Sequence, residues 1–414
     1  SRAELHVPTR RSGDMMQSAA NRDLSYQPDV RRALELVLQL MPIAGRSGQE
    51  REVAEFVRRE LRQAGCAASA LQTDSAHRRT PGGGQTGNLV LSLPGTVRAP
   101  RRMLSAHLDT VPICVGCQPQ RQGDLIRSAD PNTGLGADDR AGVAVILNTA
   151  IEILRRSLPH PPLTFCWFVQ EETGLHGSRC LTKSRLGKPA MAFNWDGGSP
   201  AKLTVGATGG YRLEIQIRGL ASHAGNAPEW GVSAIAVASL AIADLHRGGW
   251  HGDVRKGRQR GTSNVGVIQG GDATNVVTDR VLVRAEARSH QPQFRKRIAA
   301  QIEKAFRSAA AEVKTAAGAK GSVEIEGRLD YESYRLSPHE PCVAAAAEAV
   351  RAVGREPELA VTNGGLDANW LVKHGIPTVS LGCGQLHPHM TSEALLVPDF
   401  EDACRIALRL ATAC

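Results

Sequence analysis

Apolar and polar positions along the chain alternate in two different rhythms, and each rhythm predicts a different kind of element. Helical periodicity covers residues 29–64 in two pieces, with a break around residues 42–45. Apolar runs of strand length lie at residues 88–93, 102–106 and 163–169, and a helix is expected over residues 141–157. Strands that are apolar on both faces belong to a sheet covered on both sides, so this alternation predicts an α/β architecture.

The pattern changes near Gly206, after which half-exposed strands predict a smaller α+β unit. Period-two alternation is clearest at residues 211–217, and the predicted order β-α-β-β-α-β is of ferredoxin type. Its other predicted strands are 264–269, 280–288 and 322–327, and its helices are 231–245 and 293–316. The α/β pattern returns from Pro338, with elements at 340–353, 376–382 and 399–412. We therefore expect an N-terminal extension (1–28) and a larger domain in two parts (29–206 and 334–414), interrupted by an insert (207–333).

Composition adds few constraints on function, but it excludes some classes. The 414 residues carry a formal charge of +9, yet the Arg pairs are scattered and aromatic residues make up only 4%. Scattered basic pairs are typical of solvated surfaces, so no nucleic-acid partner is expected. No apolar run approaches the ~18 residues that a membrane helix needs, and the first thirty residues lack the apolar core of a secretory signal.

The nine cysteines are widely spaced, which is typical of reduced thiols in a cytoplasmic protein. Cys114 and Cys117 have the spacing of a metal or redox pair. No second Cys or His pair follows nearby, so we interpret them as loop cysteines.

Clusters of histidine and acidic residues stand where predicted strands end or helices begin. They are His107-Leu108-Asp109, Asp138-Asp139, Glu171-Glu172, Asp196, and His387-Pro388-His389. Each has a structural alternative; paired acids at a helix start, for example, also cap the helix and complement its dipole.

Taken together, the clusters supply histidines and carboxylates at the carboxyl ends of consecutive strands, where open α/β sheets bind ligands. His107 and Asp109 share one face of a strand, so the carboxylate can orient the imidazole. Adjacent Glu171 and Glu172 point to opposite sides, which suits one metal ligand and one general base. Mixed His and carboxylate ligands suit two zinc ions, or manganese or cobalt in their place.

The ordered set resembles the zinc exopeptidase family that includes peptidase T, glutamate carboxypeptidase, aminoacylase and succinyl-diaminopimelate desuccinylase, and peptidase T within it is the closest in style. The resemblance runs from about residue 30 to the C-terminus. It is carried by the segments 137–142 (ADDRAG), 171–174 (EETG) and 363–369 (NGGLDAN), with 47–50 (SGQE) and 222–225 (SHAG) in addition. Leu366 departs from the pattern, because a small hydroxyl residue usually precedes the acid that matches Asp367.

The resemblance implies a role for each acidic or histidine position of the metal site. Asp138 would bridge two metal ions, with His107 and Asp196 completing one ligand set and Glu172 and His389 the other. Glu171 would be the general base and Asp109 the partner of His107. His389 is preferred to His387 because the family places its last His four residues before a Glu, which here is Glu393.

The resemblance also implies substrate contacts from the insert, which would act as a lid and can form a homodimer interface. His223, Asn275 and Arg288 match family positions that hold the scissile carbonyl oxygen and the substrate carboxylate. A structural role for His223 and a surface salt bridge for Arg288 stay open as alternatives. The expected activity is aminotripeptidase-like hydrolysis of short peptides. An N-acyl amino acid amidohydrolase, a carboxypeptidase, and a non-catalytic binding protein on the same fold are the other hypotheses.

Overall fold

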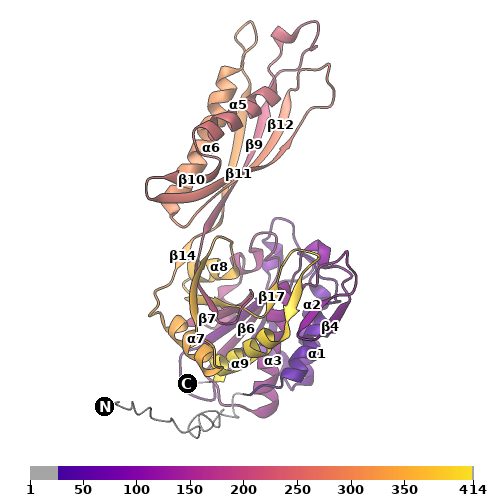
Figure 1. Cartoon of the computed structure of the whole chain (residues 1–414), viewed down its shortest axis with the longest axis vertical. Helices are drawn as coiled ribbons and strands as arrows, with labels where there is room; N and C mark the ends of the chain where they lie inside the picture. The colour runs from indigo at the N-terminus through magenta and orange to yellow at the C-terminus, as the bar shows by residue number, and fades with distance from the viewer. Residues whose placement is uncertain (1–26, 413–414) are drawn as a thin grey trace, which may run out of the picture.

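The computed structural model describes residues 27–412, so the predicted N-terminal extension lies almost entirely outside the described residues. A broad domain of helices around a large sheet carries a narrower, elongated sheet unit above it, and two extended segments of chain connect them (Figure 1). Within residues 27–412 no helix is long and apolar enough to cross a membrane.

The larger domain is built on a mixed nine-stranded sheet. The order is β1 (Leu71–Thr73), β2 (Leu89–Leu93), β6 (Leu163–Phe168), β3 (Arg102–His107), β7 (Met191–Trp195), β16 (Thr378–Leu381), β8 (Lys202–Ala207) and β14 (Tyr334–Arg335), with β15 (Glu358–Thr362) also paired to β8. The central strands β6, β3, β7 and β16 run parallel to their neighbours within this group. The carboxyl ends of these four strands therefore lie along one edge of the sheet.

Both faces of this sheet are buried, as the near-continuous apolar runs predict. Along β3, Leu104 belongs to the main hydrophobic core and its neighbour Met103 to a second cluster, as expected when side chains alternate between faces. The main core takes in α1 (Val30–Leu40), α2 (Arg51–Gln63), α3 (Ala137–Arg156), α7 (Pro341–Ala352) and α9 (Val397–Thr412). The second cluster packs against α8 (Asp367–Lys373), which in turn contacts the short α4 (His176–Arg179).

A small antiparallel sheet, which the sequence patterns did not predict, lies beside the larger one. It consists of β17 (Gln385–Leu386), β18 (Ala394–Leu396), β5 (Leu125–Ser128) and β4 (Pro119–Gln122). The strands β17 and β18 flank the loop that contains His387 and His389, so this sheet holds that loop at both ends.

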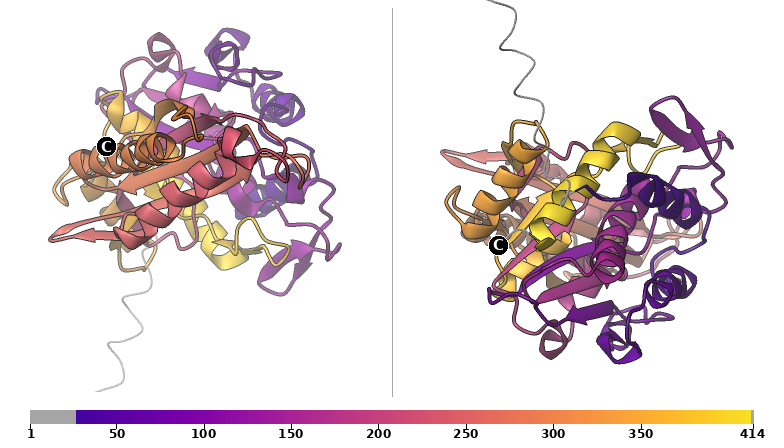
Figure 2. Two further views of the ribbon diagram at one scale, coloured as in Figure 1. Left: turned by 90° about the horizontal axis from the view of Figure 1, so that it is seen from above. Right: turned by 90° about the horizontal axis from the view of Figure 1, so that it is seen from below.

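The insert forms a separate antiparallel sheet in the order β10 (Gly252–Lys256), β11 (Gln259–Gln269), β12 (Arg280–Ser289), β9 (Gly209–Arg218) and β13 (Ser322–Tyr331). The helices α5 (Ala234–Arg247) and α6 (Pro292–Glu312) lie side by side on one face of it (Figure 2). The predicted ferredoxin-type order is present, with one strand more than predicted, because β10 pairs with β11 as a hairpin. The Ser233 side chain caps α5, so this helix begins three residues after the predicted start.

The fold is thus α/β with a mixed sheet flanked by helices, as the sequence predicts. The insert has its own core, in which strand residues such as Ile215 and Val283 pack against Phe294 and Phe306 of α6. The two cores are distinct clusters: Ala207 and Tyr334 belong to that of the larger domain, and Leu213 and Val323 to that of the insert.

Candidate active site

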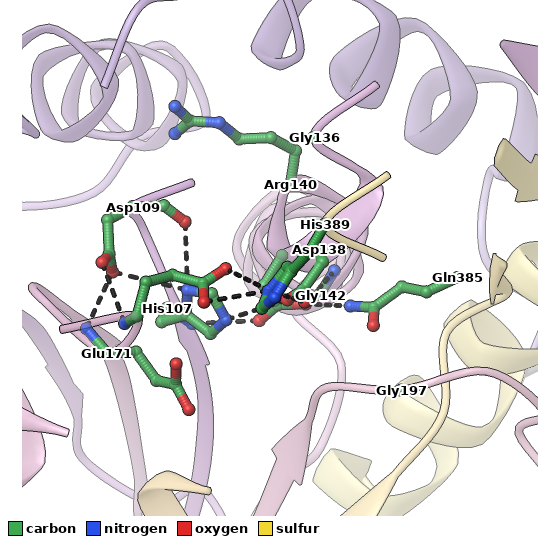
Figure 3. A network of polar contacts seen from close by, with 12 residues as sticks. His107, Asp109, Gly136, Asp138, Arg140, Gly142, Glu171, Gly197, Gln385 and His389 are labelled. Carbon is green, nitrogen blue, oxygen red and sulfur yellow. Dashed lines mark hydrogen bonds and ion pairs between the residues drawn. The ribbon is translucent and has the colours of Figure 1, made fainter. Parts of the chain in front are cut away.

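The predicted chemical residues gather at the carboxyl edge of the central strands. His107 is the last residue of β3, Glu171 and Glu172 follow β6, and Asp196 follows β7. Since β6, β3 and β7 are parallel neighbours, these side chains converge. Asp138 joins them from the start of α3, as Figure 3 shows for His107, Asp138 and Glu171.

Two groups of metal-ligand type share one carboxylate. His107, Asp138 and Asp196 form the first group, and Asp138, Glu172 and His389 the second; within each group the ligand atoms lie within 4.8 Å of one another. One oxygen of Asp138 lies 3.1 Å from Nε2 of His107, and the other lies 3.2 Å from Nε2 of His389. These five residues are the ones assigned as ligands from the sequence, and His387 belongs to neither group.

Asp109 is buried and contacts both His107 and the backbone of Glu171 and Glu172. Its carboxylate accepts hydrogen bonds from the backbone N–H groups of Glu171 and Glu172 at 3.0 and 3.1 Å, and from the Ser47 hydroxyl at 2.6 Å. Nδ1 of His107 lies 3.1 Å from the Asp109 main-chain oxygen and 3.4 Å from its carboxylate. These contacts fix the ring, so that Nε2 faces Asp138 (Figure 3).

The site holds more negative charge than its own cations can balance. Burial raises the pKa of Asp196 to about 7, and neighbouring Asp138 adds to this shift. Burial also raises the pKa of Glu171 well above its usual value, with Asp196 adding and His107 opposing. For Asp138, hydrogen bonds with His107 and His389 outweigh the effect of burial and lower the pKa. Crowded buried carboxylates with two histidines are a donor set that suits divalent cations.

A cavity of about 450 Å³ opens beside these residues and reaches the base of the insert. Asp138, Glu171, Glu172, Asp196 and His389 line one side of it, and Arg288, Arg212 and Lys202 contribute cations. The guanidinium of Arg288 is held by both oxygens of Glu286, at 2.9 and 3.0 Å. Arg288 therefore makes the salt bridge considered from the sequence and also faces the cavity. Arg212 and Lys202 were not singled out from the sequence, because isolated basic residues on strands give no distinctive signal.

His223 and Asn275 are not brought to this cavity. They lie together in loops beyond the far end of the insert sheet, where the Ala224 N–H donates to the Asn275 carbonyl. Arg288 pairs with Gly210 at the base of β9, whereas the loop with His223 follows Arg218 at its other end. Gly210 and Arg218 are eight positions apart along β9, which corresponds to roughly 26 Å. Of the three residues that the resemblance assigns to the substrate, only Arg288 therefore lines the cavity of its own chain.

Asp139 supports the start of α3 through more contacts than the helix capping that its position suggests. Asp139 is fully buried, and its carboxylate accepts hydrogen bonds from the backbone N–H groups of His107 and Gly142 and from the Gln385 amide. The sequence predicts that paired acids at a helix start can cap the helix, and the hydrogen bond from the Gly142 N–H to the Asp139 carboxylate is such a capping contact. Cys114 and Cys117 are buried, and burial raises the pKa of both thiols, which agrees with unreactive cysteines.

Comparison with known proteins gives these positions a family context. Residues 103–413 match the model of peptidase family M20/M25/M40. The chain belongs to this family. Among solved structures, a tripeptidase from Staphylococcus aureus superposes with a TM-score of 0.82 at 29% identity, over 93% of this chain and 98% of the other. Aminopeptidase PepT from Bacillus cereus gives 0.78 at 30% identity with the same coverage. The protein YqjE of Bacillus subtilis is 32% identical over 374 residues, 89% of this chain and 94% of its own length.

These similarities make the chain a peptidase T-like member of the M20/M25/M40 family, as the motifs indicate. They support an exopeptidase hydrolase that acts on peptides, and a dinuclear metal site agrees with the two ligand groups that share Asp138.

Proposed function

We propose that the protein is a di-zinc exopeptidase that hydrolyses an amide bond of short peptides, with the specificity of an aminotripeptidase. The observation that carries this proposal is the pair of ligand groups sharing Asp138, with Glu171 beside them in the same cavity. Five His and carboxylate ligands with one shared acid exceed what a single tetrahedral ion uses.

The donor set fits the two metal ions that we propose. His107 and Asp196 would hold one ion, Glu172 and His389 the other, and Asp138 would contact both. When bound, a pair of divalent ions polarises a carbonyl group and lowers the pKa of water. Zinc is the first choice for ligands of this type, and manganese or cobalt can take its place.

Glu171 has the position and the environment of a general base. Its carboxylate lines the cavity, and its backbone N–H is anchored on Asp109. Burial raises the pKa of Glu171 above its usual value, and a carboxylate that is a stronger base accepts a proton more readily. We infer that Glu171 takes a proton from the attacking water and returns it to the departing amine. Asp109 holds the backbone of Glu171 and the ring of His107 in place.

The cavity favours a small substrate with a free carboxylate. Its volume of about 450 Å³ is at the lower end of the range typical of small-molecule sites. The Arg288 guanidinium, oriented by Glu286, lines the same cavity as the acidic residues and can pair with a peptide C-terminus.

His223 would serve the site of a second chain in a homodimer formed through the insert. Its Nδ1 accepts hydrogen bonds from the N–H groups of Gly225 and Asn226, both at 3.1 Å. The proton of the neutral ring then sits on Nε2, which is a donor for a developing oxyanion. Since His223 lies at the far end of its own insert, a partner chain is the simplest source of such a donor, and symmetric dimers are common. Asn275, in the neighbouring loop, would reach the same partner site.

Two other functions compete with this one. An N-acyl amino acid amidohydrolase or a carboxypeptidase would use the same metal site and the same Arg288. A non-catalytic binding protein is disfavoured by the presence of all five ligand positions and of Glu171. The deciding experiment reconstitutes the protein with zinc and compares a panel of tripeptides with N-acetyl amino acids and C-terminally varied peptides. Removal of the N-terminal residue from tripeptides supports the proposal. Turnover of N-acetyl amino acids alone would favour the amidohydrolase, and no turnover with two metals bound would favour a binding protein.

A further inference from the structure

Glu393 is a fully buried carboxylate on which four donors converge, all from segments far away in the sequence. It directly precedes β18 and is 1% exposed. Its Oε2 accepts the backbone N–H groups of Leu135 and Gly136 at 2.8 and 2.7 Å, and its Oε1 accepts that of Asp138 at 3.0 Å. The Cys114 thiol donates to Oε2 at 3.4 Å.

Both oxygens of the carboxylate act as acceptors, and the three backbone groups around them are all donors. Among the described residues no cation forms an ion pair with Glu393, so backbone N–H groups compensate its charge. The contact is also tight: a Cβ added at Gly134 would lie 3.0 Å from Oε2 of Glu393 and 2.9 Å from the sulfur of Cys114. The segment 134–138 is thus closely fitted around this one side chain.

The position of Glu393 links two parts of the proposed metal site. Its carboxylate accepts a hydrogen bond from the backbone N–H of Asp138, which is 255 residues away in the sequence. Asp138 is the residue shared by both ligand groups. Glu393 also stands four residues after His389, at the end of the loop that presents this histidine. A single carboxylate therefore holds the loop of one ligand against the backbone of another.

We propose that Glu393 is a positioning residue, which fixes Asp138 and His389 in the arrangement that two metal ions require. The inference rests on the proposed function, since it concerns the same metal site. Groups that orient metal ligands without touching the ion typically change metal affinity or activity by about 10–100-fold. We expect an effect of that size when the carboxylate is altered.

The test is Glu393→Gln, which has nearly the same shape but places an NH₂ group where one oxygen stood. An NH₂ group in the place of Oε2 would face three donors, the N–H groups of Leu135 and Gly136 and the Cys114 thiol, and could accept from none of them. An NH₂ group in the place of Oε1 would face only one donor, the N–H of Asp138. The second orientation loses fewer hydrogen bonds and therefore costs less free energy. The variant thus loses the hydrogen bond from the backbone N–H of Asp138, the residue that we propose bridges the two ions. We expect zinc affinity, measured by competition with a chromogenic chelator, to fall by about 10–100-fold. We expect kcat to recover largely at saturating zinc.

Two matched variants separate positioning from general stability. Glu152→Gln alters another buried carboxylate, at the opposite end of α3, where Glu152 pairs with Arg32 and Arg156. It should lower the melting temperature and leave zinc affinity unchanged. Cys114→Ala removes only the thiol donor and should bind zinc within about threefold of the original chain, since all three backbone bonds remain.

Wild-type zinc affinity in Glu393→Gln would overturn the inference, and so would a loss of stability without a change in affinity. If the Gln variant does not fold, Glu393→Asp decides, because it keeps the charge but shortens the reach. Weakened zinc binding in the Asp variant supports positioning, and unchanged binding refutes it. The unmodified chain is titrated first: failure to bind two ions there would refute the proposed function itself, whereas failure confined to the variants would refute only the role of Glu393.

Discussion

Glu171→Gln isolates the proton transfer from the rest of the site. Within residues 27–412 the Glu171 carboxylate accepts no hydrogen bond from the protein, and its backbone N–H stays on Asp109 in the variant. The change also removes a buried charge that Asp196, Asp367 and Glu172 all disfavour. The variant should therefore fold with at least the stability of the original chain and keep both metal ions.

The expected loss of turnover follows from the role assigned to Glu171. General acid–base catalysis is worth about 10²–10⁴-fold, which corresponds to about 2.7–5.4 kcal/mol of barrier at 1.36 kcal/mol per decade. We expect kcat for a tripeptide to fall by that factor with little change in KM. The assay follows release of the N-terminal amino acid under zinc saturation.

The matched control for this experiment is Glu172→Gln. The Glu172 carboxylate lies 3.0 Å from Nε2 of His389 and belongs to the second ligand group, so its replacement should weaken metal binding. Near-normal turnover in Glu171→Gln would remove the base from the mechanism. If Glu172→Gln instead kept both metals and lost turnover, the two glutamates would have the opposite roles.

Three further outcomes test other parts of the account. His389→Ala should reduce bound zinc from two ions to about one by elemental analysis, whereas His387→Ala should leave two; equal losses would contradict the ligand assignment. Zinc affinity should rise as the pH increases from 6 to 8, because hydrogen bonds to carboxylates raise the pKa of His389 to about 10 and zinc must displace that proton; a pH-independent affinity would refute this. Mixing the inactive variants His223→Ala and Glu171→Gln under subunit exchange should restore activity, and no recovery despite demonstrated exchange would exclude a role for His223 across the dimer.

The elements that the sequence predicted well are those with strong periodicity. β6 reads as an apolar run because both faces of its sheet are covered, and α1 and α2 each keep one buried stripe. The hairpin of β4 and β5 was missed because its residues are mostly exposed and polar, so no alternation marks it. Its turn at Gly123, with φ of 63°, is a local signal that predicts a bend but not a strand pair.

Some residues of the candidate site could likewise be placed from the sequence, and others could not. The positions of His107, Glu171 and Asp196 follow from rules about strand ends, because parallel neighbours bring these ends together. The placement of His223 depends on the length and direction of β9, which motif matching does not consider. The hydrogen bond between Glu393 and Asp138 connects segments 255 residues apart, and no local sequence pattern predicts a contact between residues so far apart in the chain.

The central claim is that two metal ions share Asp138. The most direct measurement is a crystal structure of the zinc-reconstituted protein, with anomalous difference maps recorded on both sides of the zinc absorption edge. We predict two peaks per chain, one among His107, Asp138 and Asp196 and the other among Asp138, Glu172 and His389. A single peak, or two peaks that do not both contact Asp138, would contradict the account.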